Sequence, residues 1–276
     1  MAVIANSGYK SERPLTARAL VLDFLSNRAP REISARVVLA AGAVFGFSAQ
    51  NLRMALMRLV DQGAAVTSTR GRYRLGAPSE TMRVEVRKWK RVADLVRPWP
   101  GGWVGVYGAE IARSDRAAIR RHEQALRLRG FREFSSGLWI RPANLRDSVA
   151  ELRAHLAALG LHRDAIVVGL SDFDDAASAR AVRLWDTAAL ERSYGALLSA
   201  LDVSQSKVAR LPLTAAAAET LLLGREVIRR INLDPLLPEE LMPQRRLHEL
   251  VRAMIVYDEI GREIWRRFMR EIENRD

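Results

Sequence analysis

Polar and basic side chains line one side of a helix predicted from Ser48 to about Val60. Leu52, Leu56 and Leu59 recur with helical spacing and predict a buried face, so the side chains between them turn outward. Glutamine and asparagine suit the edge of adenine, and arginine suits guanine or a phosphate. The amino end of a helix can also receive a backbone phosphate. We therefore expect DNA contacts from Ser48, Gln50, Asn51, Arg53, Met54 and Arg58.

A basic hairpin is predicted directly after this helix. The β-prone runs "AAVTS" and "RYRLG" flank the turn sequence "TRG", and Gly71 permits a tight turn. Arg70 and Arg72 stand on either side of this glycine. In that position they could enter a minor groove or hold phosphates.

Two earlier helices would position these side chains. One begins at Thr16 with apolar residues at helical spacing, and a second runs from Ser34 to Gly46. Helices joined by a glycine-containing turn and followed by a hairpin form the winged helix-turn-helix arrangement, whose second helix of the pair lies in the major groove. The alternative is a protein-interaction module, because winged helices also serve that purpose.

Composition and charge indicate which classes of protein this chain can belong to. The 276-residue chain has a net charge of +12 and is asymmetric: residues 1–100 hold 17 basic and 7 acidic residues, whereas residues 101–276 hold 27 and 25. This asymmetry indicates that the first third of the chain binds a polyanion.

The absence of cysteine excludes disulfides and metal sites with thiolate ligands, and we expect neither a cofactor nor a metal. No apolar run is long enough to span a bilayer and no secretory signal is evident, so we expect a cytoplasmic, nucleoid-associated protein.

The remaining segments predict a multidomain α+β protein. Residues 1–79 form the winged helix-turn-helix domain, and residues 80–100 form a connecting helix with an apolar stripe at Met82, Val86, Trp89, Ala93 and Val96. Residues 101–175 read as βαββαβ, the ferredoxin-like order. Residues 176–276 read as a C-terminal helical domain, since helices there alternate with proline breaks.

Five stretches in this order resemble the PaaX family of bacterial transcriptional regulators. They are "VVLAAGAVFGFSAQNLRMALMRLVDQGAAVTSTRGRYRLG", "RPWPGGWVGVY", "RGFREFSSGLWIRP", "RAVRLWDTAALERSYGALL" and "LDPLLPEELMPQRRLHELVRAM". The resemblance implies a winged helix, a ferredoxin-like domain similar in fold to small CRISPR-associated endoribonucleases, a helical domain and a homodimer. The family's best-known member represses phenylacetate catabolism genes and is released from its operator by phenylacetyl-coenzyme A.

The resemblance implies a repressor that binds a palindromic double-stranded operator and is released by a small aromatic or acyl-CoA effector. An anionic, partly aromatic ligand needs a cation and aromatic walls. Candidates for this effector site are Trp139, Arg141, Trp185, Tyr194 and His122. The alternative is that the aromatic residues are core or domain-interface anchors and that His122 lies solvated on a helix surface.

A nuclease is the alternative enzymatic reading, because the ferredoxin-like domain is similar to a metal-dependent fold. Such a site needs carboxylates that converge on a hard cation. Glu110 and Asp115 lie near the end of the first strand, and "DFDD" at 172–175 follows the last one. Acidic turns after strands are common and solvated. No P-loop, nucleophile elbow or zinc-protease motif is present, so we expect a protein that is not an enzyme.

Overall fold

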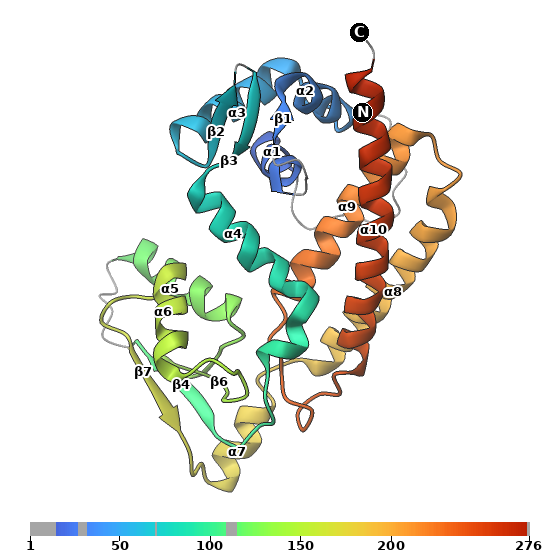
Figure 1. The fold of residues 1–276 in the computed structure, drawn as a ribbon. Coiled ribbons are helices and arrows are strands. Elements are labelled where there is room, and N and C mark those ends of the chain that lie inside the picture. Colours follow the sequence, from blue (N-terminus) through green and yellow to red (C-terminus); the bar gives the residue numbers. More distant parts are fainter. Residues whose placement is uncertain (1–14, 27–31, 70, 109–114, 275–276) are drawn as a thin grey trace. The chain divides into compact units, whose positions relative to one another are not determined.

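The computed structural model describes residues 15–26, 32–69, 71–108 and 115–274 (Figure 1). It is a mixed α+β protein with two small antiparallel sheets. The chain forms two compact units: unit 1 contains Met1–Lys90, Leu197–Ile228 and Val251–Asp276, and unit 2 contains Arg91–Ala196 and Arg229–Leu250. This grouping differs from the successive domains that the sequence predicts at 1–79, 101–175 and 176–276. The predicted C-terminal domain is divided between the two units, and residues of its last two helices pack in the core of unit 1.

The first part of unit 1 contains three helices and a small sheet. In chain order the elements are α1 (Ala17–Ser26), β1 (Ile33–Ser34), α2 (Ala35–Val44), α3 (Ala49–Asp61), β2 (Ala65–Thr69) and β3 (Arg72–Leu75). The sheet order is β1-β3-β2. The helices and the hairpin lie where the sequence predicts them, whereas the two-residue strand β1 is too short for a periodicity to reveal.

Side-chain caps fix where these helices start. The hydroxyl of Thr16 accepts a hydrogen bond from the backbone N–H of Ala19, at 3.1 Å. Ser34 and Ser48 cap α2 and α3 in the same way. Such a cap satisfies one of the N–H groups that lack a partner in the first helical turn. Between α2 and α3 the chain turns at Gly46, whose φ of +79° favours glycine.

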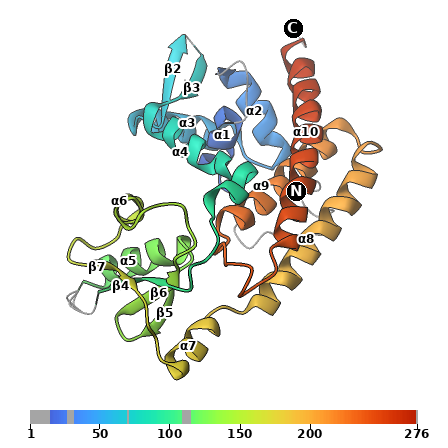
Figure 2. The same ribbon diagram turned by 60° about the horizontal axis from the view of Figure 1, so that its bottom comes forward.

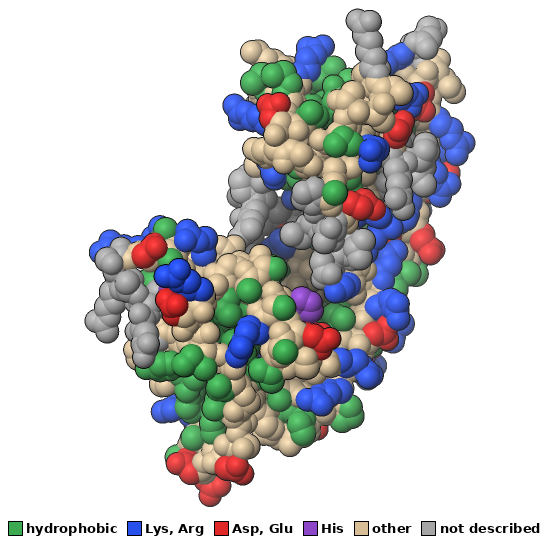
Figure 3. Space-filling view, turned by 60° about the vertical axis from the view of Figure 1, so that its left-hand side comes forward, with side chains coloured by type: hydrophobic (Ala, Val, Ile, Leu, Met, Phe, Trp, Pro, Cys, Tyr) green, Lys and Arg blue, Asp and Glu red, His purple; other side chains and the backbone are tan. Residues whose placement is uncertain are grey.

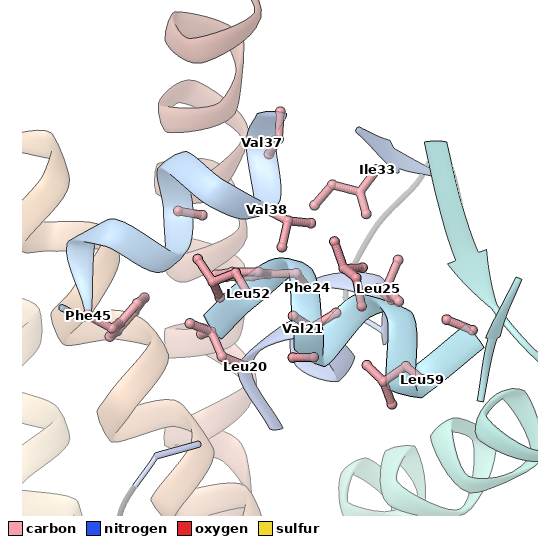
Figure 4. Packing of buried hydrophobic residues seen from close by; sticks show 14 of the residues in the cluster. Leu20, Val21, Phe24, Leu25, Ile33, Val37, Val38, Phe45, Leu52 and Leu59 are labelled. Carbon is pink, nitrogen blue, oxygen red and sulfur yellow. The ribbon is translucent and has the colours of Figure 1, made fainter. Parts of the chain in front are cut away.

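The core of unit 1 joins the two ends of the chain. Leu20, Phe24 and Leu52 point toward one another between α1, α2 and α3 (Figure 4). The same cluster includes residues of α9 (Leu213–Asn232) and α10 (Arg245–Glu273), and the first three helices lie beside these two in Figures 1 and 2. Trp265 of α10 contacts the rings of Phe24 and Phe45, with ring centroids 5.1 and 6.4 Å away. The N-terminal helices therefore share one core with the C-terminal helices.

The connecting segment is not the continuous α-helix that the sequence predicts for residues 80–100. Helix α4 (Ala77–Arg87) ends early, and the 3₁₀ helix η2 (Lys88–Leu95) follows with a kink at Arg91. Trp89 and Val92 are buried, whereas Val86 and Ala93 are exposed. The predicted apolar stripe is therefore wrong at Val86 and Ala93, and from Lys88 onward a 3₁₀ helix with three residues per turn replaces the α-helix.

Unit 2 is built around a four-stranded antiparallel sheet. Its elements are β4 (Trp103–Tyr107), α5 (Arg116–Leu128), β5 (Arg132–Ser135), β6 (Leu138–Pro142), α6 (Val149–Leu159) and β7 (Ile166–Leu170). The order of elements is thus βαββαβ, and the strand order is β5-β6-β4-β7. Val104 and Val106 face α5 and α6, where they pack with Leu126, Leu152 and Leu156.

The opposite face of this sheet is more open. Strand residues alternate between faces, so Tyr107 and its partner Ile166 project away from α5 and α6. Their side chains are 40% and 52% exposed. Figure 3 shows hydrophobic side chains gathered on the surface of this unit. At the other end of this face, Trp103 and Phe134 are covered by Phe173, Trp185 and Arg180 of the segment around α7 (Asp175–Val182), so the face is open only around Tyr107 and Ile166.

Helices make up the rest of the described chain. Helix α7 (Asp175–Val182) is followed by α8 (Thr187–Val208), which begins in unit 2 and ends in unit 1. Helix α9 begins in unit 1 and ends in unit 2. Ser204 of α8 and Tyr257 of α10 join their hydroxyls at 2.6 Å within unit 1. None of the described helices combines the length and apolar composition that crossing a membrane requires.

Candidate nucleic-acid interface

The outer face of α3 presents polar and basic side chains to solvent. Leu52, Leu56 and Leu59 are buried beneath it, as their spacing predicts. The exposed residues are Ala49, Gln50, Asn51, Arg53, Met54, Met57, Arg58 and, at the end of the helix, Asp61. Within the described chain, the guanidinium groups of Arg53 and Arg58 have no hydrogen-bond or ion-pair partner. Both cations are therefore available to an anion.

Ser48 has a structural role at the start of this face. Its side-chain oxygen accepts a hydrogen bond from the backbone N–H of Asn51, at 3.2 Å. The side chain itself is exposed. Because the hydroxyl still has a proton to donate, capping the helix leaves it able to bond an external phosphate oxygen.

The helix is held close to its neighbour by a glycine. A Cβ atom placed on Gly42 would lie 2.3 Å from Cδ1 of Leu52, so a side chain at this position would force the side chain of Leu52 to move. On the other side, Nη2 of Arg18 donates to Oε1 of Gln62 at 3.3 Å, just beyond the end of α3. These contacts fix where the outer face of α3 points within unit 1.

The hairpin adds two exposed arginines beside its turn. Gly71 has a φ of +76°, as the predicted tight turn requires. The carbonyl of Gly71 accepts a hydrogen bond from the N–H of Ala35 at 2.9 Å, which links the turn to the start of α2. Arg72 and Arg74 are exposed, whereas Arg70 lies outside the described residues. The sequence prediction omitted Arg74, although strand alternation places it on the same side as Arg72.

Positive charge dominates this part of the chain. Residues 33–75 contain six arginines and a single carboxylate, Asp61. A surface of this kind attracts a polyanion over about a Debye length of roughly 8 Å at physiological salt. All other acidic side chains of the protein lie outside this range of the sequence. The net positive charge and the exposed face of α3 therefore coincide.

The residues predicted for an effector site are buried, and the polar groups of Arg141, Trp185 and Tyr194 bind other groups of the protein. Trp139 is 5% exposed and packs in the core between the sheet and α5 of unit 2, with the guanidinium of Arg127 over its ring. Trp185 is 4% exposed, stacks on Trp103 at 6.1 Å and donates its indole N–H to the carbonyl of Gly130 at 3.1 Å. Trp139 and Trp103 lie on opposite faces of the sheet. The two tryptophans are therefore separate packing anchors.

Arg141 is buried and its hydrogen bonds are directed inward. Its Nε donates to the carbonyl of Pro142 at 3.2 Å, Nη1 donates to the carbonyl of Arg129, and Nη2 reaches Asn144 and the carbonyl of Pro235 at 3.3 and 3.2 Å. Burial lowers the pKa of Arg141 to about 9, and repulsion from Arg129 acts in the same direction. The prediction that Arg141 meets an effector anion is wrong for this conformation, because four acceptors of the protein already occupy it.

Tyr194 belongs to the same buried polar region of unit 2 as Arg141, because Asp234 acts electrostatically on both residues. Its hydroxyl donates to the carboxylate of Asp234, which also accepts the backbone N–H of Leu236 at 2.8 Å. Burial raises the pKa of Asp234 to about 6, against the lowering effect of these hydrogen bonds. Burial and the neighbouring carboxylate also raise the pKa of Tyr194. Tyr194 therefore anchors the segment after α9 and does not line a ligand site.

His122 is not the solvated residue that the sequence predicts. It is 4% exposed, on the same face of α5 as the buried Ala118, Ala125 and Leu126. Its Nδ1 accepts the backbone N–H of His162 at 3.3 Å. Burial lowers the pKa of His122, with a further contribution from His162. The flanking arginines suggested an exposed face, but the small residues one turn away on either side mark it as buried.

Two of the acidic residues considered for a nuclease cap helices. Glu110 lies outside the described residues. Asp115 caps α5 by accepting the N–H of Ala118 at 2.8 Å, and Asp174 caps α7 by accepting the N–H of Ala177 at 2.7 Å. Among the described residues, no group of three or more histidine or acidic side chains is arranged to hold a metal ion. Helix capping thus accounts for two of the candidate carboxylates.

Comparison with known proteins supplies a fold and no activity. The chain is similar to a solved structure described as the uncharacterized protein Rv0674 from Mycobacterium tuberculosis, with a TM-score of 0.57. The two share 24% identity over 90% of this chain and 99% of the other. No protein-family model matches the chain, and no curated protein matches it in sequence. At this identity the likeness is one of fold alone.

Proposed function

We propose that this protein is a DNA-binding transcriptional regulator in which residues 15–75 act as a winged helix-turn-helix. The observation that carries the proposal is the outer face of α3, where two arginines without internal partners stand beside an amide pair. In such domains a helix enters the major groove and a hairpin meets the flanking backbone. Here α3 would read bases, and Arg72 and Arg74 of the hairpin would hold phosphates.

The rest of the proposal rests on the resemblance to the PaaX family. Unit 2 would contain the ferredoxin-like domain, whose βαββαβ order and strand order fit that plan. The protein would act in the cytoplasm as a homodimeric repressor on a palindromic operator, because two-fold protein symmetry matches two-fold DNA symmetry. An aromatic or acyl-CoA effector would release it by favouring another state of the dimer.

DNA binding is tested with two substitutions on α3. Duplexes that bind the protein are first selected from a random library, and affinity is then measured by fluorescence anisotropy. We expect Arg53→Ala and Arg58→Ala each to weaken specific binding by about 1–3 kcal/mol if the side chain contacts a base. Arg210→Ala removes an exposed arginine after α8 and serves as the matched control.

Two results would argue against this function. If the selection enriches no DNA sequence, the protein is attracted to polyanions in general and does not recognise a specific site. If Arg53→Ala and Arg58→Ala both bind DNA with unchanged affinity, α3 does not contact the DNA. An interaction module would then be the better reading. A nuclease is not favoured, because the described carboxylates include helix caps and no metal-holding group. Incubation of RNA and DNA with the protein and Mg²⁺ or Mn²⁺ tests that reading directly.

The effector is tested separately from DNA binding. A ligand that binds only the folded protein raises its melting temperature in proportion to the logarithm of the ligand concentration once that concentration is well above Kd. We expect a rise with an aromatic acyl-CoA thioester and a smaller one with the free acid or with coenzyme A. Release of the selected DNA by the same thioester is the decisive second measurement. Absence of both effects would limit the proposal to constitutive DNA binding.

A further inference from the structure

Two methionines occupy the centre of the outer face of α3. The side chains of Met54 and Met57 are 41% and 57% exposed, among the most exposed large apolar residues of the described chain. Both belong to a helix whose core face is fully supplied by Leu52, Leu56 and Leu59. Large apolar side chains grouped on an exposed surface commonly mark a binding site, because exposing them to water is unfavourable.

Helical geometry places polar side chains next to these methionines. With about 100° between successive residues, Gln50 and Met57 lie on one side of Met54, and Asn51 and Arg58 lie on the other. Met54 and Met57 are separated by about 4.5 Å along the helix axis. The rise of B-form DNA is roughly 3.4 Å per base pair along one strand. The two methionines are therefore separated by between one and two base-pair steps, so they can reach the same base pair or neighbouring ones.

Charge decides between nucleic acid and protein as the occupant of this face. Six arginines and one carboxylate lie in residues 33–75, and none of the described side chains pairs with Arg53 or Arg58. A protein partner would need an acidic surface to match, whereas DNA supplies phosphates on both sides of a groove. The apolar centre then requires an apolar group on the floor of that groove.

Thymine supplies such a group. Its C5-methyl is the apolar feature that distinguishes base edges in the major groove, where the other groups are hydrogen-bond donors and acceptors. A thioether on an unbranched chain adapts its shape to the surface that it covers. We propose that Met54 and Met57 read thymine by contact with C5-methyl groups, so that each operator half-site holds one or two thymines beneath the centre of α3. This inference rests on the proposed function.

The test removes the methyl group and changes nothing else. In the selected duplex, each thymine is replaced in turn by deoxyuridine, which keeps every base-pairing and groove hydrogen-bond group. We expect affinity to fall about fourfold for each contacted methyl, at one or two positions per half-site. The same replacement elsewhere in the half-site should leave affinity unchanged.

Substitutions assign the contact to the two methionines. With Met54→Ala or Met57→Ala, the difference between thymine and deoxyuridine should disappear at the position that the deleted side chain covers. Leucine at the same site keeps an apolar contact and should restore most of the difference. Val203→Ala, which shortens an exposed apolar side chain of α8, is the matched control and should retain the full difference.

The results of these experiments distinguish a failure of the thymine contact from a failure of the proposed DNA-binding function. If no sequence is enriched, the proposed function fails and the inference fails with it. If a sequence is enriched and Arg58→Ala weakens binding, but no deoxyuridine replacement matters, the inference alone is overturned. A thymine effect that persists in both alanine variants also overturns it, because another residue then makes the contact.

Discussion

Arg53 on α3 and Arg141 on β6 are the same side chain in opposite surroundings. Arg53 stands in water with no partner in the described chain, beside other polar residues of an exposed face. Arg141 is 2% exposed and donates to four acceptors of unit 2. The guanidinium group carries five N–H donors in a fixed planar arrangement, and these two residues use them for different purposes.

This difference shows why residue type alone does not identify a ligand site. An arginine near aromatic residues satisfies the composition expected of an anion pocket, as Arg141 does. Its donors, however, already bind the carbonyls of Arg129, Pro142 and Pro235, and a ligand would have to displace them. An exposed arginine needs no such displacement. The two regions differ in whether the guanidinium N–H donors are free to bind a ligand, and the sequence does not reveal this.

The largest effect should follow from removing the buried arginine. Arg141→Ala leaves the carbonyls of Arg129 and Pro235 without a donor and opens a cavity, so we expect the free energy of unfolding to fall by about 3–5 kcal/mol. Urea denaturation followed by tryptophan fluorescence measures the change. Arg146→Ala, at an exposed position nearby in sequence, should alter stability by no more than about 0.5 kcal/mol. Equal stability of the two variants would contradict the structural role of Arg141.

The two faces of α3 should differ almost as strongly. Leu52→Ala removes a fully buried side chain beneath Gly42, and we expect a loss of about 2–5 kcal/mol. Arg53→Ala, one residue away, should change the free energy of unfolding by no more than about 0.5 kcal/mol. The same denaturation measurement applies to both. A large loss in Arg53→Ala would mean that its effect on DNA affinity reflects folding.

The smallest effect concerns pH and the buried carboxyl of unit 2. The pKa of Asp234 is about 6 in the folded protein, above its ordinary value of 3.8, so between these pH values the folded state binds more protons than the unfolded chain. The contribution of Asp234 to stability is therefore present at low pH and is lost as pH rises through 6. We expect Asp234→Asn to gain stability relative to the natural protein between pH 4.5 and 7.

Subtracting the two unfolding curves at each pH cancels the titration of groups that the variant does not change. Asp202→Asn, at an exposed position of α8, is the matched control. A difference between natural protein and Asp234→Asn that does not vary with pH would show that the folded-state pKa of Asp234 is ordinary.

Much of the fold could be predicted because local rules and packing agree. Ser34 and Ser48 start helices as capping residues, and the leucines of α3 are buried as their 3.6-residue spacing requires. The order of elements in residues 103–170 also follows from alternating patterns. What the sequence did not reveal is set by tertiary structure: the change to a 3₁₀ helix at Lys88, and the sharing of the C-terminal helices between two units.

The candidate site was predicted unevenly for the same reason. Exposure on α3 follows from helical periodicity, so its outer residues could be named in advance. Burial of Arg141 depends on the carbonyl of Pro235, ninety-four residues away, and burial of His122 depends on the segment around His162. Neither partner is visible in a local pattern. Contacts with residues far away in the sequence therefore determine that Arg141 and His122 are buried.

The core that joins α1–α3 to α9 and α10 has a consequence during synthesis. About 200 residues separate Leu75 from the end of α10 at Glu273. At roughly 5–20 residues per second, translation of this stretch takes about 10–40 s. Throughout that time Phe24 and Phe45 lack Trp265, their partner in the completed protein. The segment that is made first is therefore among the last to complete its packing, and a nascent chain halted before α10 would present an uncovered aromatic surface to chaperones.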